Sequence, residues 1–430
     1  MSYTFEPHRN FAERLDREDI LKKYRSNFHI PENIIYMDGN SLGLFSENAE
    51  KSIHRVIKEW KESAIRGWMA GEKPWFYLPE EIGKKCASIV GAEKEEVIMT
   101  GSTTVNIHSL ISTFYQPKGN RTKIIADELN FPSDIYALKG QIRIKGLDPE
   151  KELILIKSHD GRYLDEEIIA AAMTDEVALV FLPSVLFRSG QLLDMAFLTR
   201  EASKKDIFIG FDCCHSAGNI PHRFSEWGLD FAVWCSYKYM NGGPGSPAFL
   251  YINKKHFHKT PVLAGWYGCE KTRQFDMSID FGHSRSAGGW QISTQGMLSA
   301  APVESALDII LEAGMDNIRE KSKKITSYLA YLVEMVLSKK PYNFKIGTPL
   351  DPEKRSGHIA LEHETEAVRI GKALLDNHVI PDFRPPNVIR IAPAPLYNTY
   401  LEVYEMVQIL KKIMDTKEYE HYSKERGTVS

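Results

Sequence analysis

The sequence predicts an α/β fold, with a large domain built on a mostly parallel sheet and a small C-terminal α+β domain. Two apolar runs, EVALVFLPSVLFRSG from Glu176 and DIFIGFDCCHSAG from Asp206, have the length of strands but lack polar alternation. Such strands are buried on both faces, as in a parallel sheet covered by helices. Helical patterns, for example at 164–173 and 195–204, separate the predicted strands, and this alternation is typical of a layered α/β domain.

The first third of the chain supplies the earlier elements. Apolar residues recur at helical spacing between Ser46 and Arg66, and a second helical pattern runs from about Leu78 to Val90 and stops at Gly91. The segment EEVIMTGSTTVNIHSLI predicts a short strand, a turn and the start of a helix. TKIIADELNFPSD predicts a strand followed by a loop. Strands and helices therefore alternate up to about residue 253.

The pattern changes after GGWQIST. A long helical region is predicted at about Gln295–Leu337, and beyond it NFKIGTP, SGHIALEHE and VIRIAPAP alternate with helices near Thr365–Asn377 and Tyr400–Met414. We therefore predict three parts: an N-terminal segment, 1–45, that packs with the small domain; a large domain, 46–300; and a small α+β domain, 301–430. The boundary is expected inside the long helical region.

Composition excludes several classes of protein. The 430 residues carry a net charge of −3, which gives no reason to expect nucleic acid or an anionic membrane as partner. The N-terminus is charged and lacks the apolar stretch of a secretory signal. Five cysteines form no C-x-x-C pair, and adjacent Cys213 and Cys214 suit neither a disulfide nor zinc. We expect a cytoplasmic protein with free thiols and no metal.

Polar residues follow four of the predicted strands. They are Thr103-Thr104, Phe131–Asp134, Asp212–His215 and Tyr237-Lys238. In open α/β sheets, ligands bind at the carboxyl ends of the strands. Residues that lie far apart in the sequence are therefore expected to meet in one site.

Most of these features also have a plain structural interpretation. The hydroxyls and free N–H groups of Gly101–Thr104 suit a phosphate, but a helix N-cap explains the same residues. Asp212 needs a partner for its carboxylate, and either a protonated ring nitrogen or a salt bridge would serve. His215 could contact a ring or be an ordinary buried histidine. Cys213 and Cys214 are expected to be packing residues.

Lys238 has the most informative surroundings. It lies between two tyrosines, after the apolar FAVWCS and before the rigid turn NGGPGSP, which argues against a solvated surface lysine. An amine with a lowered pKa can form an imine with an aldehyde. Pyridoxal phosphate needs such a lysine, an acid for its pyridine nitrogen and a phosphate site. The sequence offers all three.

The segment FDCCHSAGNIPHRFSEWGLDFAVWCSYKYMNGGPGSPAFLYI resembles kynureninases, which are pyridoxal-phosphate enzymes of fold type I related to class V aminotransferases. MDGNSLGL, STTVNIH, FPSDIYAL, SVLFRSGQLLDM, LAGWYG and VIRIAPAPLYNTY are also similar to segments of that family, in order. The resemblance extends from about Tyr36 to the final helix. It implies a seven-stranded, mostly parallel sheet in the large domain.

The resemblance also implies roles for individual residues. Lys238 would hold the cofactor and move protons, Asp212 would bond the pyridinium nitrogen, and Arg390 would bind the substrate α-carboxylate. Tyr237 would contact phosphate and assist protonation. The other cofactor contacts would come from Thr103, Thr104, Phe131, Pro132, Ser133, Asp134 and His215, and from Trp266 and Thr294 of a neighbouring subunit, so a homodimer is expected.

The implied reaction is hydrolytic Cβ–Cγ cleavage of L-kynurenine, or 3-hydroxykynurenine, to anthranilate, or its 3-hydroxy form, and L-alanine, in tryptophan catabolism or NAD synthesis. The chain departs from known members at four positions. Thr103 replaces leucine and Thr294 replaces asparagine in some members, whereas Cys269 and Trp68 stand where the animal enzymes have histidine. Trp68 would lie near the substrate ring, so these departures bear on the preference for ring substituents.

Three other interpretations remain open. A cysteine desulfurase or selenocysteine lyase would need a cysteine on a mobile loop, and Cys269 is the candidate outside the predicted strands. An aminotransferase would share the fold. A non-catalytic family member would be expected to have lost Lys238 or Asp212, but the chain has both.

Overall fold

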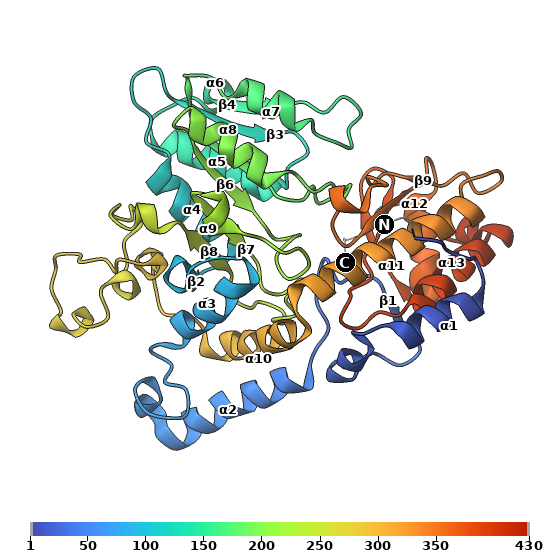
Figure 1. Ribbon diagram of the computed structural model, residues 1–430, viewed down its shortest axis with the longest axis horizontal. Helices are drawn as coiled ribbons and strands as arrows, with labels where there is room; N and C mark the ends of the chain where they lie inside the picture. The colour runs from blue at the N-terminus through green and yellow to red at the C-terminus, as the bar shows by residue number, and fades with distance from the viewer. Residues whose placement is uncertain (1–2, 428–430) are drawn as a thin grey trace.

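A seven-stranded sheet forms the centre of the larger part of the protein in the computed structural model, which describes residues 3–427 (Figure 1). Its strands, in spatial order, are β2 (Val97–Met99), β8 (Phe249–Ile252), β7 (Phe231–Trp234), β6 (Phe208–Asp212), β5 (Val177–Pro183), β3 (Lys123–Asp127) and β4 (Leu153–Ile156). β8 pairs antiparallel with both of its neighbours, and the other neighbouring strands of this sheet pair in parallel. The predicted mostly parallel sheet is confirmed.

Helices cover both faces of this sheet, as its apolar strands require. Alternate residues of a strand point to opposite faces. In β5, Val180 and Leu182 lie in one apolar cluster and Leu179 and Phe181 in another. The first cluster includes residues of α3 (Leu78–Ile89), α7 (Glu166–Ala172), α8 (Met195–Lys204) and α10 (Met297–Ala313); the second includes residues of α4 (Thr103–Phe114) and α5 (Pro132–Ile144).

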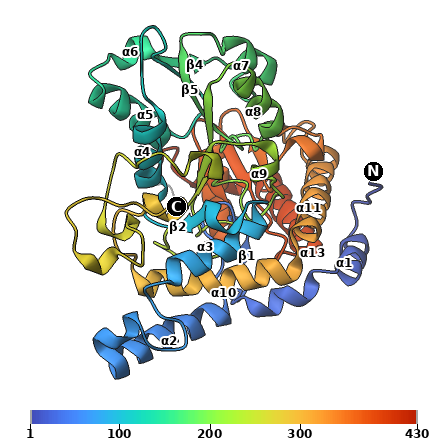
Figure 2. The same ribbon diagram turned by 60° about the vertical axis from the view of Figure 1, so that its left-hand side comes forward.

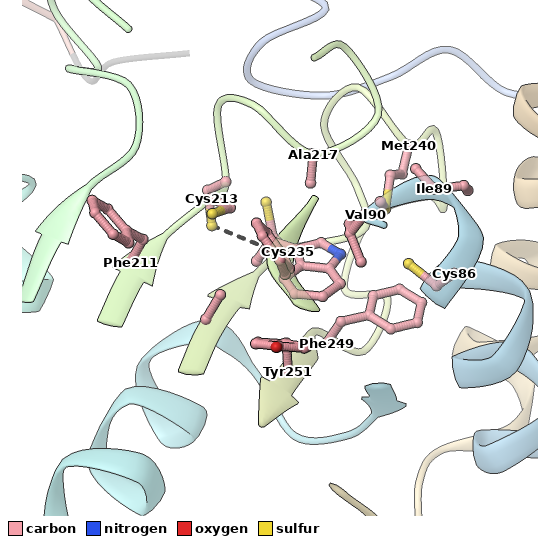
Figure 3. Close-up of a cluster of buried hydrophobic side chains, with 14 of the residues drawn as sticks. Cys86, Ile89, Val90, Phe211, Cys213, Ala217, Cys235, Met240, Phe249 and Tyr251 are labelled. Atoms are coloured by element: carbon pink, nitrogen blue, oxygen red, sulfur yellow. Dashed lines mark hydrogen bonds between the residues drawn. The ribbon is translucent and has the colours of Figure 1, made fainter. Parts of the chain in front are cut away.

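Figure 3 shows part of the first cluster. Cys86 and Ile89 of α3 are packed with Phe249 and Tyr251 of β8, and all four side chains are nearly or fully buried. Short helices α6 (Pro149–Glu152) and α9 (Phe224–Trp227) lie in the connections, and α2 (Glu47–Ser63), followed by a 3₁₀ turn at Ala64–Trp68, packs along α10 (Figure 2). Among residues 3–427, no helix combines the length and the apolar character needed to cross a membrane.

The smaller part is built on a four-stranded antiparallel sheet. Its strands are β12 (Asp382–Arg384), β13 (Val388–Ile391), β10 (Ile359–Glu362) and β9 (Lys345–Ile346), in that order. Helices α11 (Met315–Val336), α12 (Ala367–Asp376) and α13 (Tyr400–Asp415) complete it. From the N-terminal segment, α1 (Arg9–Glu18) packs on α13, and β1 (Ile35–Tyr36) pairs with β11 (Val379–Ile380). The exact division at residues 45 and 300 stays a prediction.

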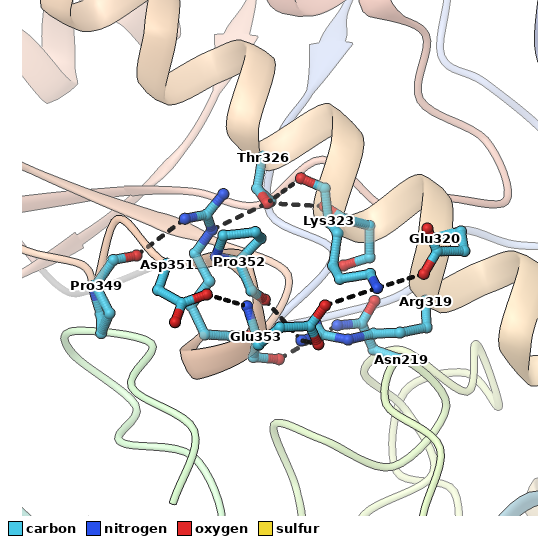
Figure 4. A network of polar contacts seen from close by, with 12 residues as sticks. Asn219, Arg319, Glu320, Lys323, Thr326, Pro349, Asp351, Pro352 and Glu353 are labelled. Carbon is cyan, nitrogen blue, oxygen red and sulfur yellow. Dashed lines mark hydrogen bonds and ion pairs between the residues drawn. The ribbon is translucent and has the colours of Figure 1, made fainter. Parts of the chain in front are cut away.

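The long helical region predicted at 295–337 is two helices rather than one. α10 ends and α11 begins at Gly314, which adopts φ +80°, a conformation that side chains disfavour. Arg319 of α11 donates to the carbonyls of Arg355 (2.9 Å) and Pro352 (2.7 Å), as Figure 4 shows for part of this network. Arg319 thus holds the segment 352–355. The next residue is Ser356, whose hydroxyl donates to the carbonyl of His215 (2.7 Å) in the larger part.

Candidate active site

One cavity of about 250 Å³ lies at the carboxyl ends of the central strands, where the two sheets approach. Ten of the residues predicted from the sequence line it together: Thr103, Thr104, Phe131, Ser133, Asp134, Asp212, His215, Tyr237, Lys238 and Arg390. The sheet order explains this convergence. β7, β6, β5 and β3 are neighbours, so the segments that follow them meet at one edge.

Lys238 is half-buried in the loop that follows β7. Its Nζ lies 3.1 Å from Nε2 of buried His215. Burial, and next the charge of Lys238, hold the pKa of His215 well below its ordinary value, so the imidazole is neutral and accepts from the amine. His215 is thus a partner of Lys238.

The pKa of Lys238 itself differs from expectation. Burial acts to lower it, but the thiols of Cys235 and Cys214 and the carboxylate of Asp212 together leave the pKa of Lys238 above its ordinary value. The lowered pKa expected of an imine-forming amine is therefore not produced by the chain's own groups. The physical reason is that the acidic groups around the amine outweigh desolvation at this position.

Three carboxyl groups, those of Asp212, Asp134 and Asp127, lie near one another, and the first two line the cavity. Asp212 ends β6, and its Oδ1 accepts from the N–H of Cys214 at 2.7 Å. Burial, and then the charge of Asp212, raise the pKa of Asp134 well above its usual range; burial raises the pKa of Asp127 to about 7. Protonated Asp134 can donate to Asp212, which leaves one negative charge facing the cavity. That charge suits a cationic ring nitrogen.

The start of α4 forms another wall. The side chain of Ser102, the residue that precedes the helix, makes no capping hydrogen bond, so the predicted N-cap does not account for the GSTT segment. Thr104 Oγ1 and Ser133 Oγ lie 2.7 Å apart, and both residues line the cavity. Hydroxyls and unsatisfied N–H groups at a helix N-terminus together suit a phosphate.

Aromatic side chains lie between these two walls. Phe131 is 47% exposed and meets Phe187 edge to face, with ring centroids 5.5 Å apart. A ring face that is left accessible can stack on a planar ligand. Tyr237 is half-buried, and burial raises the pKa of its hydroxyl, so the group keeps its proton.

Arg390 comes from β13 and forms the opposite wall. Its side chain is buried; Nη1 donates to the carbonyl of Phe187 (2.7 Å) and Nη2 to Ser41 Oγ (3.1 Å). Nη2 also forms an ion pair with Asp382. Arg390 Nε has no partner among the described residues, so the guanidinium is fixed in place and still has a donor to offer.

Four predicted site residues do not line this cavity. Pro132 is exposed at the start of α5. Trp68 packs edge to face against Trp75 (5.6 Å), Trp266 donates to the carbonyl of Gln274 (3.1 Å), and Thr294 is exposed. The segment around Trp266 projects from the larger part (yellow in Figure 1). These residues are not brought to the cavity of their own chain.

The sequence-based prediction missed several lining residues, among them Asn40, Ser41, Phe187 and Arg384. The first two belong to the segment MDGNSLGL, which carried a family signal but no assigned role. Both polar side-chain atoms of Asn40 are buried without a partner among the described residues, which could not be deduced from the sequence. Arg384 lies on β12, a strand that the sequence pattern did not predict.

Comparison with known proteins gives a consistent result. Residues 318–410 match the family model described as "Kynureninase C-terminal domain". Curated relatives named "Kynureninase" include those of Geobacillus thermodenitrificans (57% identical, 100% of both chains), Bacillus cereus (55%, 99% of both) and Shouchella clausii (51%, 98% of both).

The solved structures show the same fold at lower identity. "Apo structure of Cysteine Desulfurase from Thermococcus onnurineus NA1" has a TM-score of 0.78 at 17% identity and covers 92% of this chain and 98% of that one. The Escherichia coli cysteine desulfurase CsdA has a TM-score of 0.76 at 16% identity, covering 96% of this chain and all of that one. At such identities the likeness concerns the fold alone.

Proposed function

The chain belongs to the kynureninase family, and we propose that it is a pyridoxal-phosphate-dependent hydrolase that splits the Cβ–Cγ bond of L-kynurenine or 3-hydroxykynurenine. The products would be anthranilate, or 3-hydroxyanthranilate, and L-alanine. One observation carries the proposal: Lys238, Asp212 and Arg390 surround a single cavity in a chain 51–57% identical to kynureninases over nearly its whole length.

The cavity fits pyridoxal phosphate at each of its functional parts. Lys238 can bind the aldehyde carbon, and Asp212 offers a negative charge to the ring nitrogen. Thr103, Thr104 and the start of α4 can hold the phosphate, and Phe131 presents an accessible ring face. The cofactor supplies an electron sink for the carbanions that form at Cα and later at Cβ.

The chain's own groups would supply the rest of the chemistry. Arg390 binds and orients the α-carboxylate, as a planar guanidinium can do with two parallel bonds. Lys238 would take the proton from Cα, and neutral His215, 3.1 Å away, would hold the amine in place. Tyr237, protonated at neutral pH, can return a proton to Cβ after the bond breaks. Water adds at the γ-carbonyl.

We further propose a homodimer in which Trp266 and Thr294 reach the phosphate of the neighbouring subunit, and Trp68 its substrate ring. Their absence from the lining of their own cavity supports this arrangement. So do exposed apolar side chains near Trp266, which include Phe275 (61%), Met277 (71%) and Ile279 (101%). The expected setting is tryptophan catabolism or NAD synthesis in the cytoplasm.

Sulfur transfer is the alternative that the fold neighbours raise, and the cysteines argue against it. Cys269 forms a backbone bridge with His283 and does not line the cavity. Cys214 does line it, but burial raises its pKa well above the usual range, which makes it a poor nucleophile. Cys269 is therefore not placed to attack a substrate in the cavity, and Cys214 is held as a neutral thiol.

The direct test is to incubate the purified protein, loaded with pyridoxal phosphate, with L-kynurenine and with 3-hydroxykynurenine. We expect anthranilate or its 3-hydroxy form, followed by fluorescence, and an equal amount of alanine. L-Cysteine and an α-keto acid test the two alternative activities in parallel. Release of sulfide, or transamination without anthranilate, would overturn the proposal.

A further inference from the structure

A buried cluster of charges lies on the Arg390 side of the cavity. Asp382 and Arg390 are cross-strand partners on β12 and β13, and Arg384, two residues along β12, points to the same face. Asp382 is fully buried; it pairs with Arg390 and, through Oδ2, with Arg384 Nε at 3.1 Å. Both arginines line the cavity. One carboxylate is thus shared by two guanidinium groups.

A second carboxyl group, Asp38, approaches the cluster from the N-terminal segment. Its backbone forms a parallel bridge with Ala392, just beyond β13, and its side chain is buried. Ser41 links the two sides, because its backbone N–H donates to the carbonyl of Asp38 at 3.0 Å and its hydroxyl accepts from Arg390 Nη2 at 3.1 Å. Asp38 Oδ1 has no partner among the described residues.

The charged groups of this cluster do not balance when Asp38 is protonated. Arg384 and Arg390 carry two positive charges, and Asp382 balances one of them. Burial, and then the charge of Asp382, raise the pKa of Asp38 to about 7, so below neutral pH Asp38 is uncharged and one positive charge faces the cavity unbalanced. An arriving carboxylate would balance it. Above neutral pH, ionised Asp38 would balance it instead.

The charged groups that face Asp38 are Asp382 and Arg384 from β12 and Arg390 from β13, and Ser41 lies beside them. The neighbouring groups with shifted pKa values are Tyr36 from β1, Tyr239, Tyr397, and His215 and His358 beside the arginines. Burial raises the pKa of all three tyrosines, so they stay protonated. It lowers the pKa of His215, and that of His358 to about 3, so both stay neutral.

We propose that Asp38 is a positioning residue of the substrate site: the α-carboxylate binds to Arg390 only when Asp38 carries a proton. Ser41 and Asp382, the counter-ion that both arginines share, connect Asp38 to Arg390. This rests on the proposed function, because it assumes that Arg390 receives the carboxylate. It adds a residue and a proton to that site. Substrate binding would then weaken as Asp38 loses its proton.

The test uses 4-(2-aminophenyl)-4-oxobutanoate, which is kynurenine without its α-amino group. It keeps the ring, ketone and carboxylate but lacks the α-amino group through which kynurenine would bond to the cofactor. Calorimetric titration of the holoenzyme in buffers of different ionisation enthalpy measures the Kd and the protons taken up. With a pKa of about 7, we expect uptake of nearly one proton at pH 8 and almost none at pH 5.5. The Kd should rise by as much as about 25-fold between pH 6.5 and 8.5.

Two variants make the test specific. Asp38→Asn should bind the probe with a nearly constant Kd over this range and without proton uptake from that site. Asp16→Asn is the matched control. Burial raises the pKa of Asp16 too, but Asp16 accepts from the N–H groups of Tyr400 and Leu401, away from the cavity, so this variant should behave like the wild type.

The outcomes separate this inference from the function itself. A wild-type protein that does not bind the probe at any pH would overturn the assignment of Arg390, and with it part of the proposed function. Binding without proton uptake, or equal uptake by Asp38→Asn, would overturn the role of Asp38 alone. The wild-type measurement decides the matter even if Asp38→Asn fails to fold.

Discussion

Replacing Arg390 with lysine tests the geometry of the proposed carboxylate site, because the charge stays while the planar guanidinium is lost. Arg390 donates to Phe187 O at 2.7 Å and Ser41 Oγ at 3.1 Å and pairs with Asp382. An ammonium group cannot keep these three contacts and also bind a carboxylate with two parallel bonds. The loss of one charged hydrogen bond costs about 1.5–3 kcal/mol. We therefore expect kcat/KM for kynurenine to fall about 10- to 150-fold.

The loss should appear mainly in KM, because Lys238 and Asp212 are untouched. Steady-state formation of anthranilate measures both constants, and thermal unfolding checks that the variant is folded. Arg188→Lys is the matched control: Arg188 donates to Gly161 O (3.5 Å) and Asn387 Oδ1 (3.1 Å) but does not line the cavity. If Arg390→Lys kept kcat/KM within threefold of the wild type, Arg390 would not be the carboxylate ligand.

Three further predictions concern the cofactor, the dimer and stability. Lys238→Ala should abolish turnover and the visible absorption that the wild-type holoenzyme shows; retention of both would contradict the cofactor assignment. Trp266→Ala should have lowered activity. If Trp266 and Lys238 act across a subunit boundary, an equal mixture of Trp266→Ala and Lys238→Ala that is unfolded and refolded together should recover roughly a quarter of wild-type activity. No recovery would place Trp266 outside the partner's site. Lys321→Met removes the ion-pair partner of buried Asp19 (2.7 Å) and should lower the free energy of unfolding, measured with urea, by about 3–5 kcal/mol. The control Lys84→Met, at an exposed ion pair, should lower it by less than about 1 kcal/mol. Equal losses would count against a structural role for the buried pair.

The central sheet could be predicted because its strands carry a strong and simple signal. β5 is buried along its whole length, and only a two-sided apolar environment accounts for a run such as VALVFLP. The short β12 carries no such signal. Its Asp-Phe-Arg sequence lies between prolines, and it is a strand because β13 offers Arg390, Ile389 and Val388 as pairing partners. The break at Gly314 was equally hidden, since apolar helical spacing continues on both sides of it.

The residues of the site also fall into those that the sequence could place and those that it could not. Residues that follow central strands could be placed from the sequence, because parallel strands deliver their carboxyl ends to one edge. Asp38 and Arg384 could not, because their meeting depends on long-range registers: the bridge of Asp38 to Ala392 and the pairing of β12 with β13. The charges of Asp38 and Arg384 also indicate a binding site only when they are considered together with those of Asp382 and Arg390. A lone aspartate in MDGNSLGL carries no indication that its carboxyl group faces two arginines.

The two ends of the cavity share one electrostatic arrangement. At one end Asp134 lies against Asp212, and at the other Asp38 lies near Asp382; in each pair, burial beside a second acid raises the pKa of the first. Two adjacent buried carboxyl groups cannot both ionise at low cost, so below neutral pH each pair favours one proton and one charge. At the Asp212 end the charge faces the cavity and suits a cation. At the Asp382 end the negative charge is paired with two guanidinium groups, those of Arg384 and Arg390, so the net charge there is positive and suits an anion. A zwitterionic amino acid joined to a cationic ring matches this polarity in one orientation only.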